Sequence, residues 1–138
     1  MCIRDRHVIE LFHGYTYSAH PLACAAGLAT LDVYRDEDLF ARARKLEPLW
    51  AQAAMGLRDL PNVLDIRTVG LTVGIDLASK PDAVGKRGYE ALEAAYYNHD
   101  LMLRAVGDTL ALSPPLIISE SQISEIFDKV SKIIKAVS

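Results

Sequence analysis

Residues 62–78, NVLDIRTVGLTVGIDLA, decide the fold class of this chain. In the second half of the stretch, polar or small residues alternate with four apolar ones, namely Leu71, Val73, Ile75 and Leu77. Successive side chains of a strand point to opposite faces, so this spacing predicts a β-strand with one buried face. The stretch is split near Gly70 into two short runs, which predicts two strands.

The segments before this stretch have helical spacing instead. A first helix is predicted from Pro21, because a proline in the first helical turn sacrifices no hydrogen bond. A second helix follows from apolar residues at three- and four-residue steps, which are Leu39, Ala43, Leu46, Trp50, Ala53, Leu57 and Leu60. We expect Asp36 or Asp38 to cap this second helix. We also expect Pro48 to kink or split it, because proline cannot donate the backbone hydrogen bond.

After residue 78 the sequence predicts two more helices with a hairpin between them. The third helix covers roughly residues 84–98, and the last one carries an apolar stripe that begins at Ile123. Residues 101–112 are typical of a β-hairpin that turns at Gly107 and Asp108. Ser119 and Gln122 have the spacing of a capping box. Short strands grouped between helices predict an α+β domain of two layers with a mainly antiparallel sheet.

Composition limits the possible functions. The 138 residues are the size of one ordinary domain, and 51% hydrophobic content supports a real core. A net charge of −3 gives no basic footprint for nucleic acid. No apolar run reaches the ~18 residues of a membrane span, and the first residues carry charges where a signal peptide would be apolar. Because two cysteines without framework spacing favour a reducing compartment, we expect a cytoplasmic protein with no membrane partner.

Two features stand out as candidate binding sites. The loop from His13 to Pro21 is rich in hydroxyl donors, Thr16 among them, and it leads into a helix N-terminus, which favours an anion such as phosphate. An ordinary polar loop is the alternative. Arg104 lies in the middle of the first predicted strand of this apolar hairpin, Leu101–Val106, and its planar guanidinium is suited to a carboxylate. A surface position or a salt bridge is the alternative for Arg104.

Other kinds of chemistry find no support in the sequence. The four histidines form no metal-ligand pattern, so no metal site is predicted. The chain has no glycine-rich phosphate loop after a strand, no evident pair of nucleophile and base, and no convincing pair of carboxylates. We therefore predict no catalytic residue within these 138 residues.

Two long motifs resemble one enzyme family. Residues 13–34, HGYTYSAHPLACAAGLATLDVY, closely resemble the loop and helix of class III (omega-amino acid) aminotransferases. Residues 103–119, LRAVGDTLALSPPLIIS, resemble the C-terminal hairpin of the same family. Both occur in the family's order, and the resemblance extends from His7 to the end of the chain, closest to the omega-amino acid (β-alanine)–pyruvate branch.

The resemblance implies the C-terminal small domain of a fold type I enzyme that uses pyridoxal 5'-phosphate. In this interpretation residues 37–138 are that α+β domain, with an antiparallel sheet packed against helices. Residues 7–36 are then a loop and an interdomain helix from the end of the large domain. Residues 1–6 resemble nothing in the family and are interpreted as a non-native start.

The resemblance also assigns roles to single residues. Thr16 would reach across a dimer to the phosphate of the partner's cofactor, and Tyr15 would line the partner's pocket. Arg104 matches the mobile arginine that holds the carboxylate of the amino acceptor. The implied partners are a homodimer or a dimer-based homo-oligomer, an amino donor and pyruvate.

One departure from the family decides the expected activity. The lysine that forms the Schiff base with the cofactor belongs to a strand upstream of the loop, and no lysine of this chain stands in that context. Pyridoxal chemistry requires that lysine, so we expect the chain alone to be inactive. The alternative hypothesis is a non-catalytic α+β interaction domain.

Overall fold

A computed structural model of the chain describes residues 16–138. The chain divides after Glu37 into two compact units, and each is described by itself. The described part of the first unit contains a turn at residues 16–19 and the helix α1 (Pro21–Asp36). The helix begins with proline at its first turn, as the sequence predicts, and none of its residues is buried.

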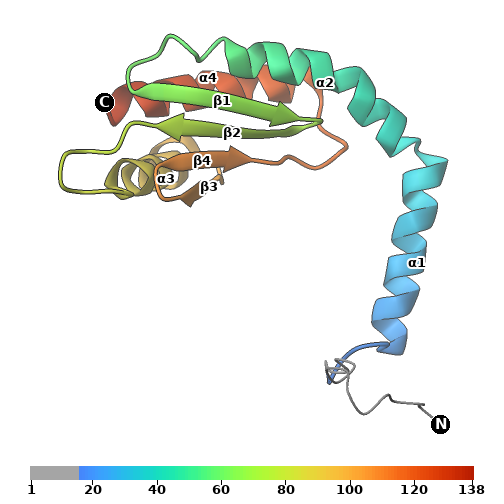
Figure 1. Cartoon of the computed structure of the whole chain (residues 1–138). Helices are drawn as coiled ribbons and strands as arrows, with labels where there is room; N and C mark the ends of the chain where they lie inside the picture. Colours follow the sequence, from blue (N-terminus) through green and yellow to red (C-terminus); the bar gives the residue numbers. More distant parts are fainter. Residues whose placement is uncertain (1–15) are drawn as a thin grey trace, which may run out of the picture. The chain divides into compact units, whose positions relative to one another are not determined.

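The second unit contains three helices and four strands in the predicted order (Figure 1). Its helices are α2 (Leu39–Met55), α3 (Lys86–His99) and α4 (Glu120–Ala136). Its strands are β1 (Val63–Val69), β2 (Thr72–Leu77), β3 (Arg104–Val106) and β4 (Thr109–Leu112). The predicted α+β class and the antiparallel sheet are therefore confirmed.

The four strands form one antiparallel sheet in the order β1-β2-β4-β3. Two local hairpins, β1–β2 and β3–β4, turn at Gly70 and Gly107, where positive φ angles of 55° and 59° favour glycine. The hairpins join through β2 and β4, in which Ile75 pairs with Leu110. This arrangement leaves β1 and β3 as the two edges of the sheet.

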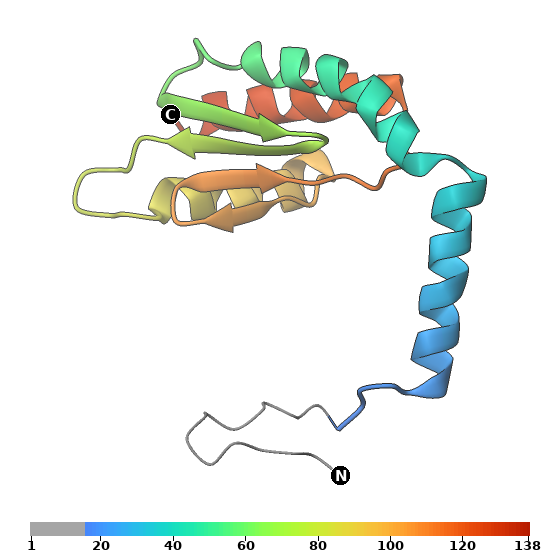
Figure 2. The ribbon, with the colours of Figure 1, turned by 45° about the vertical axis from the view of Figure 1, so that its right-hand side comes forward.

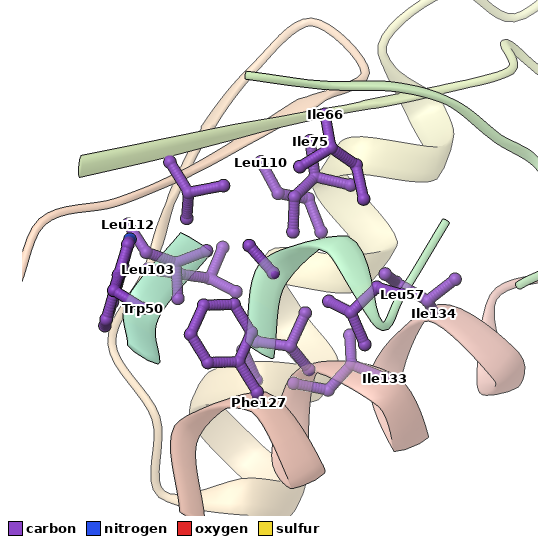
Figure 3. Close-up of a cluster of buried hydrophobic side chains, with 14 of the residues drawn as sticks. Trp50, Leu57, Ile66, Ile75, Leu103, Leu110, Leu112, Phe127, Ile133 and Ile134 are labelled. Carbon is purple, nitrogen blue, oxygen red and sulfur yellow. The ribbon is translucent and has the colours of Figure 1, made fainter. Parts of the chain in front are cut away.

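The hydrophobic core lies between one face of the sheet and the helices (Figure 3). Ile75 and Leu110 enter it from the central strands, Trp50 from α2, and Phe127 from α4. The Trp50 and Phe127 rings meet edge to face with centroids 4.8 Å apart, a favoured aromatic geometry. The alternating apolar residues of β2 are buried, which confirms the period-two prediction.

Of three predictions about helix caps and a helix break, one is confirmed and one is wrong, and the third concerns Pro48. The capping box at α4 is confirmed, because the Ser119 side chain accepts from the Gln122 backbone and the Gln122 side chain accepts in return. The predicted aspartate cap of α2 is wrong: Asp38 occupies the N-cap position in a left-handed conformation and makes no side-chain cap bond. Pro48 does not split α2, which continues through it to Met55.

Candidate functional site

Thr16 lies in the exposed turn that leads into α1. The His20 backbone N–H donates to the Tyr17 carbonyl at 3.2 Å, and Ala19 has a positive φ of 61°. This turn leaves the side chains of Thr16 and Tyr17 in solvent, so the Thr16 hydroxyl is accessible to a ligand from outside the unit. Tyr15, the other predicted cofactor contact, lies outside the described residues.

Arg104 is the first residue of the edge strand β3, and its side chain is exposed. The sequence placed it in the middle of a strand from Leu101 to Val106, and this was wrong. Arg104 pairs with Ala111, and Leu112, the next residue of β4, has no partner in β3. The β3–β4 ladder stops at Arg104, and the guanidinium emerges where the pairing ends.

The cross-strand register places Arg104 in one row with small residues of the neighbouring strands. Arg104 lies opposite Ala111, Ala111 opposite Gly74, and Gly74 opposite Arg67. Because paired residues of adjacent strands share a face, Arg104 and Arg67 lie on the same side of the sheet, away from the core. Among residues 16–138, no carboxylate forms an ion pair with Arg104.

Arg67, in contrast, is held by acidic residues. Its guanidinium donates two hydrogen bonds to Asp76, one of them at 2.9 Å, and one to Asp65 at 3.1 Å. These bonds, first to Asp76 and then to Asp65, raise the pKa of Arg67 above its usual range. The bonds from Arg67 and from the Thr109 hydroxyl, at 2.7 Å, lower the pKa of Asp76. Of the two arginines in the row, only Arg104 is thus available to bind a carboxylate.

Sequence reasoning did not identify the acidic residues of this sheet as part of a network. Asp76 was interpreted only as the polar member of an alternating strand, and Asp108 only as a turn residue. The pairing of Arg67 with Asp76 has a weak sequence signal, since both lie on outward-facing positions of one hairpin. The side-chain contacts of Asp108 span twenty residues or more, and no pattern around Asp108 itself indicates them.

The family-level comparison agrees with the two motifs. The sequence model of the family described as "Aminotransferase class-III" matches residues 1–134. The chain belongs to the class III aminotransferase family. Among curated relatives, an omega-aminotransferase from Caulobacter vibrioides is 49% identical over 126 residues, covering 91% of this chain and 28% of the relative. A beta-alanine–pyruvate aminotransferase from Pseudomonas aeruginosa is 35% identical and covers 96% of this chain and 29% of the relative.

Solved structures of transaminases share the fold. A thermostable omega transaminase from Pseudomonas jessenii, solved as a 6-fold mutant, superposes with a TM-score of 0.84 at 29% identity. That match covers 93% of this chain and 30% of the transaminase chain. The chain therefore spans less than a third of the length of the curated relatives and of this structure.

Thr16 and Arg104 belong to different units of the chain.

No lysine among residues 16–138 is buried, and Lys80 and Lys129 form ion pairs with glutamates. Within the same residues no cluster of histidine, cysteine or acidic side chains is placed to hold a metal ion. In this described part, no helix has the length and apolar character needed to cross a membrane.

Proposed function

We propose that this chain is the C-terminal segment of a pyridoxal-phosphate transaminase that transfers an amino group from an omega-amino acid or amine to pyruvate. Family membership supports the reaction class. The acceptor is inferred from relatives named as beta-alanine–pyruvate and omega-amino acid–pyruvate aminotransferases. Residues 37–138 are assigned to the small domain, and residues 7–36 to a loop and helix from the end of the large domain.

The observation that carries this proposal is the state of Arg104. It is exposed, it lies where the β3–β4 ladder ends, and no carboxylate of residues 16–138 pairs with it. A guanidinium in this state can hold the carboxylate of pyruvate through two parallel hydrogen bonds. Since Arg104 starts a short edge strand, its long side chain can also turn away when a substrate without that carboxylate is bound.

The described residues fit one contact with the cofactor. When bound, pyridoxal phosphate supplies the electron sink of the reaction. The exposed hydroxyl of Thr16 can donate a hydrogen bond to its phosphate, and we assign this contact to the cofactor of the partner subunit in a homodimer or a dimer-based homo-oligomer. Tyr15 is assigned to the wall of the same pocket. We assign no catalytic residue to this chain.

The decisive experiment replaces Arg104 in the full-length enzyme. Losing a charged, bidentate contact removes about 1.5–3 kcal/mol, so Arg104→Ala should lower kcat/KM for pyruvate by roughly 10- to 100-fold. The half-reaction with the amine donor should keep its rate. Arg44→Ala removes an exposed arginine from α2 and is the matched control. Equal activity with pyruvate before and after the Arg104 substitution would rule out the assigned role.

A second experiment tests the expectation that the chain alone is inactive. The isolated 138-residue chain, mixed with pyridoxal phosphate, should give no absorption band of a cofactor bound to lysine. Addition of a separately expressed large domain from a relative should restore transamination. Restored activity separates this proposal from a non-catalytic interaction domain, which no observation here favours. Failure of every large domain tested, despite association with the chain, would contradict the proposal.

A further inference from the structure

The turn of the β3–β4 hairpin lies beside the N-terminal end of α3 (Figure 2). Asp108, in this turn, is the buried acidic residue that joins the two elements. Its Oδ1 accepts from the Gly88 backbone N–H at 2.9 Å. Its Oδ2 accepts from the Gly85 backbone N–H and from the Ser79 hydroxyl, both at 2.7 Å. One carboxylate therefore binds the hairpin to α3 and to the loop before it.

Asp108 performs the task of an N-cap for a helix to which it does not belong. The N-cap position of α3 is Gly85, which has no side chain to accept a bond from the first helical turn. The helix instead receives its acceptor from Asp108, across the chain, and the negative charge meets the positive end of the helix dipole. Removing Asp108 would therefore leave the start of α3 uncapped.

The backbone around Asp108 is arranged for this close approach. A Cβ atom at Gly88 would lie only 2.1 Å from the Gly107 carbonyl oxygen, so only glycine allows the hairpin turn to come this near. Burial by itself would raise the pKa of Asp108, but the bonds from Gly85, Gly88 and Ser79 outweigh it and lower that pKa. The carboxylate is consequently ionised at neutral pH, the state that makes the strongest bonds.

The same hairpin carries Arg104, two residues before the turn end of β3. β3 has three residues and pairs with β4 alone, so its ladder provides little resistance to a tilt of the strand. We propose that Asp108 is a positioning residue for Arg104: by capping α3 from the hairpin turn, it fixes the edge strand from which the guanidinium projects. This inference rests on the proposed role of Arg104 as the acceptor-binding group.

The kinetic test compares two substitutions of Asp108 in the full-length enzyme. Asp108→Ala removes every acceptor, whereas Asp108→Asn keeps one carbonyl oxygen and should have a smaller effect. Because a displacement near 1 Å is costly for a positioned group, Asp108→Ala should raise KM for pyruvate by roughly tenfold. The donor half-reaction should change less than the acceptor half-reaction. Equal losses in both half-reactions, or no loss in either, would overturn the proposal.

Ser119→Ala is the matched control, because it also removes a helix cap, but from α4 and away from the hairpin. It should leave the ratio of donor to acceptor rates unchanged. Arg104→Ala separates a failure of the proposed function from a failure of the positioning role of Asp108. If that variant shows no selective loss with pyruvate, the proposed function fails. If it does and Asp108→Ala does not, only the positioning role fails.

A second readout needs no cofactor and uses the 138-residue chain itself. Amide hydrogen exchange should become roughly tenfold faster in the hairpin ladder of the Asp108→Ala chain, around Val106 and Leu110, as local opening becomes easier. The Ser119→Ala chain should instead show faster exchange at the start of α4. Unchanged protection of the hairpin amides in the Asp108→Ala chain would refute the positioning role of Asp108, even if the full-length variant enzyme proved too unstable to assay.

Discussion

Alanine at position 88 should destabilise the second unit far more than its single added methyl group suggests. The new Cβ atom would lie 2.1 Å from the Gly107 carbonyl oxygen and 3.0 Å from the Asp108 Cα. Since these are backbone atoms, no side-chain rotation relieves the overlap. The hairpin turn must move away by about 1 Å to restore an ordinary contact.

Three effects set the loss of unfolding free energy in Gly88→Ala. Overpacking of this kind costs about 1–3 kcal/mol. The outward shift also stretches the 2.9 Å bond from Gly88 N–H to the buried Asp108 carboxylate, a charged bond that contributes about 1.5–3 kcal/mol when intact. Alanine returns at most about 1 kcal/mol through its better helix propensity. We therefore expect Gly88→Ala to lose about 2–4 kcal/mol of unfolding free energy.

Urea unfolding followed by tryptophan fluorescence measures this loss. Trp50 is the only tryptophan, and it is fully buried in the core, so its emission reports unfolding of the second unit. Gly74→Ala is the matched control: its Cβ would lie 3.6 Å from the Arg67 side chain, an ordinary contact, and the urea midpoint should hardly change. A Gly88→Ala midpoint equal to that of the control would show that the turn does not approach α3 as described.

Further predictions concern a helix cap, acidic pH and a core aromatic residue. Ser119→Ala should lower the unfolding free energy by about 1 kcal/mol in the same assay, and Ser119→Asp should retain most of it; equal losses would contradict the capping role. Because the pKa values of Asp76 and Asp108 are lowered from 3.8, their stabilisation is complete above that value and is lost as the pH falls through the lower folded values. Urea midpoints measured across the acid range should therefore fall less steeply with decreasing pH in Asp108→Asn than in the parent chain. Parallel curves would exclude Asp108 as a source of the acid dependence. Trp50→Ala should lower the unfolding free energy by about 3–5 kcal/mol, measured by circular dichroism. Trp50→Phe should lower it less, because phenylalanine keeps an aromatic ring in the core and the indole N–H that both variants remove has no partner among the described residues; equal losses would contradict this expectation.

Local patterns predicted nearly all of the secondary structure. The change from helical spacing to alternation at residues 62–78 identified β1 and β2, and the glycine turn at Gly107 identified the second hairpin. The capping box located the start of α4 within one residue. These signals involve neighbours in the chain, and local chain geometry is what sequence periodicity reports.

Long-range features could not be predicted in the same way. Nothing in the sequence states that β2 pairs with β4, because the two hairpins join through buried apolar faces that many registers would satisfy. Asp108 was interpreted as a turn residue, although its contacts lie about twenty positions earlier. One signal was available: the segment before Lys86 offers no side chain at the N-cap, so α3 required an acceptor from elsewhere.

The candidate site shows the same division between chemistry and geometry. Thr16 and Arg104 were selected by the chemistry of their side chains and by family resemblance, and both are exposed in the structure. The predicted position of Arg104 within its strand was wrong, because the alternating pattern could not show where pairing stops.

The two ends of the β3–β4 hairpin are held in opposite ways, and this contrast suits the mobile, carboxylate-binding role proposed for Arg104. At the turn, the Asp108 carboxylate accepts from the backbone N–H of Gly85, the N-cap of α3, at 2.7 Å and from that of Gly88, in the first turn of α3, at 2.9 Å, which fixes the strand. At the open end, pairing stops at Arg104, so nothing in the ladder restrains the guanidinium beyond its own backbone. A fixed strand backbone with an unrestrained side chain is the arrangement that an arginine needs if it is to hold the carboxylate of one substrate and move aside for another. Loosening the hairpin turn at Asp108 should therefore weaken acceptor binding even though Arg104 itself is unchanged.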